Sequence, residues 1–133
     1  MSLEVGYVKE IDRIITSREV IEFSKISGDN NPIHLDSEYA KNTIFKRRIV
    51  HGMHSASFIS GLLSGIFNDF DGIYVSQSIK FIKPIYLDET IKVRVILKKI
   101  IPAKSLYIFD TLCEVNGDIA VEGQAEILCL TKK

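Results

Sequence analysis

The chain contains 133 residues, a length typical of one domain, and 46% of them are hydrophobic. That hydrophobic share is enough for a packed core and excludes a disordered chain. Seventeen basic and seventeen acidic residues cancel to a formal net charge of zero, so the charge balance predicts neither a nucleic-acid partner nor a membrane-surface partner.

The sequence carries no sign of export or membrane insertion. Its first ten residues, MSLEVGYVKE, lack the basic and then apolar pattern of a signal peptide. The longest apolar stretch, 53–67, is interrupted by serines and glycines and is too short to span a bilayer. Cys113 and Cys129 show no CxxC spacing and are expected to be buried, reduced thiols. We therefore expect a soluble, cytoplasmic protein.

The first half of the sequence predicts a strand, two helices and a sharp loop. Residues 5–15 carry apolar side chains that fit one strand or a pair of short strands. Ser17 is expected to cap a helix that Gly28 ends. A loop follows over 29–34, and Asp36 is then expected to cap a short second helix.

The second half predicts a long helix followed by an antiparallel meander. Residues 52–67 are apolar or small on nearly every face, which is typical of a buried helix. After Asp71 the hydrophobic period changes to two, which indicates strands. Four such runs are expected, at 73–81, 91–98, 106–115 and 119–130. Asn116-Gly117, between the last two runs, is a strong signal for a β-hairpin.

An apolar helix followed by a long antiparallel sheet predicts that the sheet wraps around the helix. We therefore expect an α+β fold made of a single hotdog domain over residues 1–133, with about five antiparallel strands around a buried central helix. An open sheet of this kind leaves edge strands, which pairing of two copies would protect. The expected assembly is a homodimer, and a higher assembly of dimers stays open.

The segment 28–34, GDNNPIH, is the most informative candidate for a functional site. Pro32 argues against a continuous helix through it, because proline lacks the amide donor and pushes the preceding residue toward extended dihedrals. A bent loop can direct the side chains of Asp29 and His34 at one point. A carboxylate and an imidazole so placed suit acid–base chemistry on one water molecule. The simpler interpretation is a turn-capping aspartate beside a structural histidine.

The run 27–36, SGDNNPIHLD, resembles the signature Asp-x-Asn-Pro-aliphatic-His of the MaoC-like (R)-specific enoyl-CoA hydratases. The runs RIVHGM at 48–53 and QSIKF at 77–81, with Pro84, are also similar to this family. The resemblance covers nearly the whole chain. It implies reversible hydration of a trans-2-enoyl thioester to the (R)-3-hydroxyacyl thioester, and with it a place in fatty acid metabolism.

The resemblance also implies roles for five residues. Asp29 and His34 match the catalytic pair of the family. Gly52 matches the glycine whose backbone N–H holds the thioester carbonyl oxygen, and Asn31 matches the motif asparagine, which we expect to fix the loop. Ser60 matches, less closely, a serine that lines the acyl pocket, and a small packing residue is the alternative. Gly52 is expected to open the long helix, where unpaired N–H groups and the helix dipole favour a developing oxyanion.

The implied substrate is a short- or medium-chain enoyl-CoA. Coenzyme A enters only as part of that substrate, so no cofactor is expected, and an acyl-carrier-protein thioester stays open as the carrier. Chain length, physiological direction and the division of base and acid between Asp29 and His34 also stay open. The basic run 46–48 is expected to be a solvated loop, with contact to an anionic part of coenzyme A as the alternative.

Other functions can use the same residues. A hotdog thioesterase would place water against the carbonyl carbon, and a non-catalytic acyl-thioester-binding protein would bind without turnover. Metal-ligand types are also present, in Asp29, His34, His51 and His54. We expect no metal, because no close carboxylate accompanies His51 and His54, and His51 precedes the helix-opening glycine. His51 is expected to be structural, with its ring fixing the loop that enters the helix.

Overall fold

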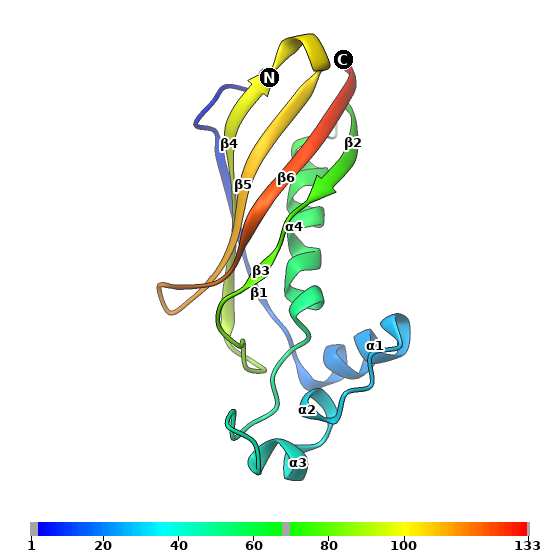
Figure 1. Ribbon diagram of the computed structural model, residues 1–133, viewed down its shortest axis with the longest axis vertical. Coiled ribbons are helices and arrows are strands. Elements are labelled where there is room, and N and C mark those ends of the chain that lie inside the picture. The colour runs from blue at the N-terminus through cyan, green and yellow to red at the C-terminus, as the bar shows by residue number, and fades with distance from the viewer. Residues whose placement is uncertain (1–2, 68–69, 133) are drawn as a thin grey trace.

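The computed structural model describes residues 3–67 and 70–132, which form an α+β hotdog fold with a curled antiparallel sheet packed on one long helix (Figure 1). The strands are β1 (Val8–Ile14), β2 (Phe70–Gln77), β3 (Lys80–Phe81), β4 (Thr90–Ile101), β5 (Leu106–Val115) and β6 (Asp118–Lys132). The helices are α1 (Ser17–Ser27), α2 (Pro32–Leu35), α3 (Ser37–Lys41) and α4 (Gly52–Ile66), with a 3-10 turn, η1, at Pro102–Lys104. The predicted fold class is confirmed.

The sheet is antiparallel and follows the order β1-β4-β5-β6-β2, with the short β3 also pairing with β6. Asn116 and Gly117 join β5 to β6 and both have positive φ, 53° and 82°. Positive φ at both central residues is the geometry of a type I′ turn, so the predicted hairpin is confirmed. β1 and β2 are the edge strands of the described sheet.

The hydrophobic core lies between α4 and the concave face of the sheet. Four residues of β4 on the inward side are completely buried: Ile91, Val93, Val95 and Leu97. They form one cluster with the inward side of α4, where Ile59 and Leu63 are each 1% exposed. Burial of each such side chain contributes about 1.5–3 kcal/mol, so this contact holds the helix against the sheet.

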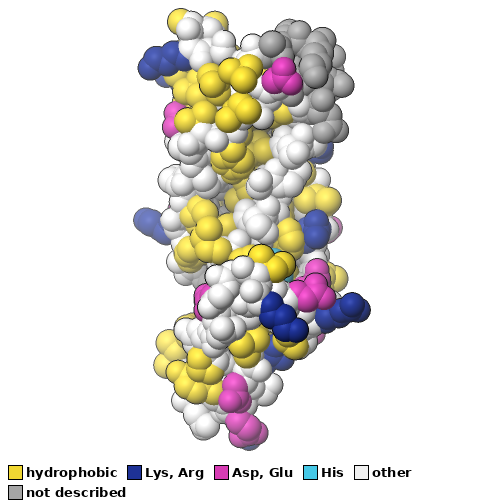
Figure 2. Space-filling model, turned by 90° about the vertical axis from the view of Figure 1, so that its right-hand side faces the viewer, with side chains coloured by type: hydrophobic (Ala, Val, Ile, Leu, Met, Phe, Trp, Pro, Cys, Tyr) yellow, Lys and Arg dark blue, Asp and Glu magenta, His cyan; other side chains and the backbone are white. Residues whose placement is uncertain are grey.

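Burial of α4 is one-sided within the single chain. Large apolar residues face the sheet, whereas the opposite side is exposed and carries Met53, Ser57, Ser60, Gly61 and Ser64. The sequence predicted burial on nearly every face, because this side has small residues and no charge. Figure 2 looks onto the side of the molecule where α4 lies, and hydrophobic side chains run down its middle while charged ones lie mostly along its margins and lower half.

The strand predicted over 73–81 is interrupted and forms β2 and β3. At the break, the N–H of Ser78 donates to the carbonyl oxygen of Gln124, and the hydroxyl of Ser78 accepts from the N–H of Gln124, each at 2.9 Å. A Cβ at Gly123 would lie 1.8 Å from the carbonyl oxygen of Ser78, so only glycine fits beside the break. After it, β3 brings Phe81 against the start of α4.

Two further predictions concern the cysteines and the membrane. Cys113 and Cys129 are both buried thiols on strands, as expected. Burial raises the pKa of the Cys113 thiol to about 12, so it is a core side chain and not a nucleophile. Across residues 3–67 and 70–132, no helix has the length and apolar character needed to cross a bilayer.

Candidate active site

Two capping motifs fix the ends of α1, the helix that leads to the loop. The hydroxyl of Thr16 accepts from the N–H of Glu19, and the carboxylate of Glu19 accepts from the N–H of Thr16. The prediction that Ser17 is the N-cap is therefore wrong by one residue, because Glu19 stands three positions after Thr16 and completes a capping box with it. Gly28, with φ of 81°, ends the helix as predicted.

Side-chain to backbone hydrogen bonds fold the loop between α1 and α2. The Asp29 carboxylate accepts from the N–H of Asn31 at 3.2 Å, and the Asn31 side chain accepts from the N–H of Ile33 at 3.1 Å. Pro32 is the first residue of α2, where a missing N–H costs nothing. The sequence predicted a loop through His34. One turn of helix carries His34 instead, because Asn31 caps that turn and Pro32 suits its start.

His34 is buried and is held by its ring and by its backbone. Nδ1 lies 2.8 Å from the carbonyl oxygen of Ile49, which can only accept, so Nδ1 carries a proton and donates it there, and Nε2 is left for other partners. The carbonyl oxygen of His34 accepts from Nε of Arg48 at 2.7 Å. Nη1 of Arg48 also donates to the hydroxyl of Ser17 at 2.9 Å. Arg48 therefore braces α2 against α1, and its part in the predicted solvated basic loop was wrong.

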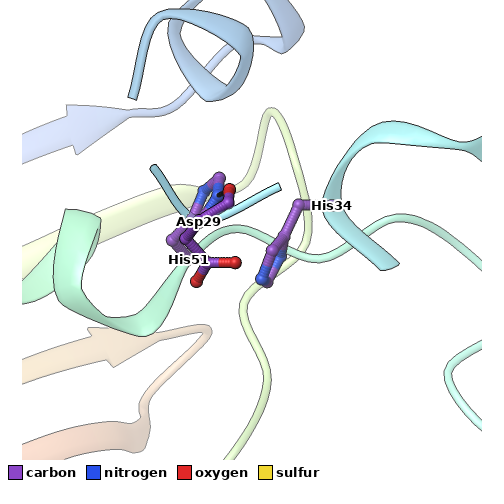
Figure 3. A group of neighbouring side chains, drawn as sticks. All are labelled: Asp29, His34 and His51. Carbon is purple, nitrogen blue, oxygen red and sulfur yellow. Dashed lines mark hydrogen bonds between the residues drawn. The ribbon is translucent and has the colours of Figure 1, made fainter. Parts of the chain in front are cut away.

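Asp29 and His34 converge with His51 in one small volume (Figure 3). One carboxylate oxygen of Asp29 and one ring nitrogen of each histidine all lie within 4.8 Å of one another. Asp29 is exposed, whereas His34 and His51 are 8% and 2% exposed. The group is therefore open to solvent on its carboxylate side and closed on its imidazole side.

Ring geometry decides what this group can hold. The imidazoles of His34 and His51 are stacked, with centroids 3.9 Å apart and 28° between their planes. A metal ion lies about 2.0–2.1 Å from an imidazole nitrogen, whereas Nδ1 of His34 is engaged by the carbonyl oxygen of Ile49 and Nε2 of His51 by Asp29 and Ser24. His54 packs on Phe23 instead of joining the group. The arrangement fits a water molecule better than a metal ion.

The Asp29–His34 pair opens into a pocket of about 480 Å³. The pocket is also lined by Gly52 and by apolar side chains that include Phe45, Ile49, Met53, Phe81, Ile82 and Pro84. As the first residue of α4, Gly52 has an N–H without a partner inside the helix. A carboxylate, an imidazole and a helix N-terminus therefore meet at one largely apolar cavity.

Phe81 is a pocket residue to which the sequence analysis assigned no role. A Cβ at Gly52 would lie 2.7 Å from Cε1 of the Phe81 ring, so the ring lies directly against the first residue of α4. Phe81 stands in the QSIKF run that resembles the family, but nothing in its spacing connected it with Gly52.

Ser60 does not lie with the pair. It is exposed on α4, about two turns after Gly52. It lines a separate pocket of about 390 Å³ together with Leu63 and Phe67. Its role in acyl binding stays a prediction.

The fold and this pocket define a class: hotdog proteins with a carboxylate–imidazole pair beside the N-terminus of the central helix. The family model described as "MaoC like domain" matches residues 3–107, and the chain belongs to this family. The resemblance found in the sequence is confirmed.

Individual relatives cover nearly the whole chain. The (R)-specific enoyl-CoA hydratases of Rhodospirillum rubrum and Aeromonas caviae are each 35% identical to it over 95% of its length, which is 88% and 95% of theirs. The solved structure of an (R)-hydratase from A. caviae matches with a TM-score of 0.91 at 35% identity, covering 95% of this chain and 96% of that one.

Buried histidines make the stability of the fold depend on pH. Burial lowers the pKa of His51 and of His54 below the ordinary value of 6.5. Below pH 6.5 the unfolded chain therefore binds protons at these rings that the folded protein does not. The contribution of these rings to the free energy of unfolding is then fully present above pH 6.5. As the pH decreases below 6.5, it is lost by at most about 1.4 kcal/mol per pH unit for each ring.

We expect the Tm, followed by circular dichroism, to fall between pH 7.5 and pH 5.5, with a smaller fall in His54→Phe. That variant removes one of the two titrating rings and keeps an aromatic side chain against Phe23. A Tm that is flat or rises over this interval would contradict the assignment of neutral buried rings.

Proposed function

We propose that the protein catalyses the reversible hydration of short- or medium-chain trans-2-enoyl-CoA to (R)-3-hydroxyacyl-CoA, with Asp29 and His34 acting together on one water molecule. The observation that carries this proposal is the convergence of the two side chains on an apolar pocket beside Gly52. The names of the two 35% identical relatives support the substrate class. Coenzyme A belongs to the substrate, and the reaction as proposed uses no other cofactor.

One water molecule can bridge the pair. Its two hydrogen bonds of about 2.8 Å span roughly 4.5 Å, and the Asp29 oxygen and a His34 nitrogen lie within 4.8 Å of each other. Nδ1 of His34 is engaged by Ile49, so Nε2 is the nitrogen available to the water. The pair removes a proton from the water as its oxygen bonds to C3, the C2–C3 double bond opens, and a proton is delivered to C2. Which of the two groups acts as base and which as acid stays open in this proposal.

Gly52 supplies the third element of the chemistry. As water adds to C3, negative charge builds on the thioester carbonyl oxygen. The N–H of Gly52 donates to that oxygen, and the dipole of α4 adds partial positive charge at the same end. A donor of this kind contributes about 2.7–4 kcal/mol to the barrier reduction.

The test is an assay with crotonyl-CoA. We expect enoyl absorbance to fall without release of free thiol, and the product to be (R)-3-hydroxybutyryl-CoA. Asp29→Asn and His34→Ala should each lower kcat at least about a hundredfold, because each removes one partner of the water. Asp36→Asn is the matched control, since an asparagine can still accept from Glu38 and Tyr39 at the start of α3, and it should keep kcat within about threefold.

Each of the other outcomes identifies a different function. Thiol release that keeps pace with substrate loss would identify a thioesterase. Binding without turnover would identify a carrier or partner subunit. A folded Asp29→Asn or His34→Ala variant that loses less than about threefold in kcat would reject the assigned roles.

A second prediction concerns Gly52. Gly52→Ala should keep the fold but lower kcat/KM at least about tenfold, because its Cβ pushes the exposed Phe81 ring toward the pocket. The cause can be isolated with Phe81→Ala, which removes the ring that the methyl group meets. In that background the loss from Gly52→Ala should be smaller, and equal losses in both backgrounds would show that the Gly52–Phe81 contact is not responsible.

We extend the proposal to a homodimer. β2 is an edge strand, and Ile73 and Val75 on it are 49% and 55% exposed. Pairing of two such edges would satisfy their backbone groups and bury these side chains. In sedimentation velocity we expect a species of twice the 15.0 kDa chain mass. Val75→Lys should shift the sedimenting species toward the monomer. Val5→Lys, at an exposed valine before β1, is the control and should not. A wild-type protein that is monomeric at every concentration would refute the dimer.

We also propose that the protein works in the cytoplasm. Cys113 and Cys129 are buried thiols, and a reducing compartment preserves thiols.

A further inference from the structure

We propose that His51 is a positioning residue for the Asp29–His34 pair, acting through the backbone of Asp29 and the ring face of His34. The inference rests on the proposed function, because it assigns His51 to the same reaction. It goes beyond a histidine that merely fixes the entry to α4, since it predicts an effect on turnover that the buried His54, on the same helix, does not share.

The first contact holds the acidic residue. Nε2 of His51 lies 3.1 Å from the carbonyl oxygen of Asp29 and 3.1 Å from the hydroxyl of Ser24. A carbonyl oxygen can only accept, so Nε2 carries the proton and donates to Asp29. Nδ1 of His51 is buried and has no hydrogen-bond partner among the described residues. Within the described part of the chain, the hydrogen bonds of the His51 ring are therefore with the Asp29 backbone and the Ser24 hydroxyl.

The second contact holds the imidazole. The His51 ring stacks on the His34 ring at 3.9 Å between centroids. The Ile49 carbonyl fixes the edge of the His34 ring, while His51 covers its face. The orientation of His34 is thus set in two directions, and one of them depends on His51.

The place of His51 in the chain supports a task outside the helix. His51 is the N-cap residue of α4, and its side chain makes no capping hydrogen bond. Serine, threonine, aspartate and asparagine are the residues that stabilise such positions, and the chain uses Thr16 and Asp36 to cap α1 and α3. α4 therefore lacks the stabilisation of a side-chain N-cap, and the His51 ring hydrogen-bonds instead to the loop that carries Asp29.

His54 provides a matched comparison on the same helix. It is 8% exposed, its Nδ1 also has no hydrogen-bond partner within the described chain, and it stacks on Phe23 at 4.6 Å. Its ring contacts are with Phe23 and Phe58. A purely structural role would make the two histidines equivalent in their effect on turnover.

The kinetic experiment compares His51→Phe, which keeps a ring and removes the donor, with His54→Phe. Hydration of crotonyl-CoA by His51→Phe should show kcat at least about tenfold lower with KM within about threefold, because misplaced reacting groups slow the chemical step while the pocket wall is intact. His54→Phe should keep kcat within about threefold of the wild-type value, although its loss of Tm is similar to that of His51→Phe. His51→Gln, which carries an amide N–H, should recover part of kcat, and it replaces His51→Phe in the comparison if that variant does not fold.

A second readout does not depend on turnover. The chain has three histidines, so ¹⁵N-histidine NMR reports three rings. The wild-type spectrum should show His34 protonated at Nδ1 and His51 at Nε2. His51→Phe should shift the His34 signals, and His54→Phe should leave them in place.

The outcomes separate this inference from the function on which it rests. Wild-type protein that hydrates crotonyl-CoA, with His51 and His54 variants that lose kcat equally or not at all, would overturn the positioning role and leave the proposed function standing. Wild-type protein without hydratase activity would refute the proposed function. Unchanged His34 signals in His51→Phe would overturn the positioning role in either case.

Discussion

Burial of α4 against the concave sheet is the constraint on which the site depends. The apolar side of the helix, with Ile59 and Leu63, meets the buried row of β4 and sets where the helix lies. That contact also sets where the helix begins, and Gly52 is its first residue. The chemistry proposed for the pocket needs an N–H at that point, a carboxylate and an imidazole. The packing of α4 against the sheet therefore both stabilises the core and places the N-terminus of α4 at the pocket.

The loop that carries Asp29 is organised by hydrogen bonds, in contrast to the core. Asn31 caps α2, Arg48 joins α2 to the start of α1, and His51 joins the loop to the start of α4. Three of these four bonds engage backbone groups of the loop or of α2, and the bond from Arg48 to the Ser17 hydroxyl adds a contact to α1. A short loop with several fixed points loses little freedom on meeting a substrate, and preorganisation of this kind is what acid–base catalysis requires.

Patterns local in the sequence predicted most of the fold and the centre of the site. The period of two predicted the strands, Asn116-Gly117 predicted the hairpin, and the motif ending in His34 identified the loop. Two local details were missed, the Thr16 cap of α1 and the helical turn that carries His34. The larger omissions depend on residues far apart in the chain. Phe81 meets Gly52 across 28 intervening positions, and Arg48 turns inward to groups on α1 and α2. Neither contact leaves a periodic or spacing signal.

The break at Ser78 divides the edge of the sheet beside β6 into two strands with different surroundings. On one side of it β2 presents Ile73 and Val75 outward, and on the other β3 forms a wall of the reaction pocket, although both strands pair with β6. If two copies pair through β2 as proposed, substitutions at Ile73 and Val75 can change that pairing without moving the pocket wall, which lies beyond the break. Gly123 lets β6 pass close to the break, because a Cβ there would lie 1.8 Å from the carbonyl oxygen of Ser78.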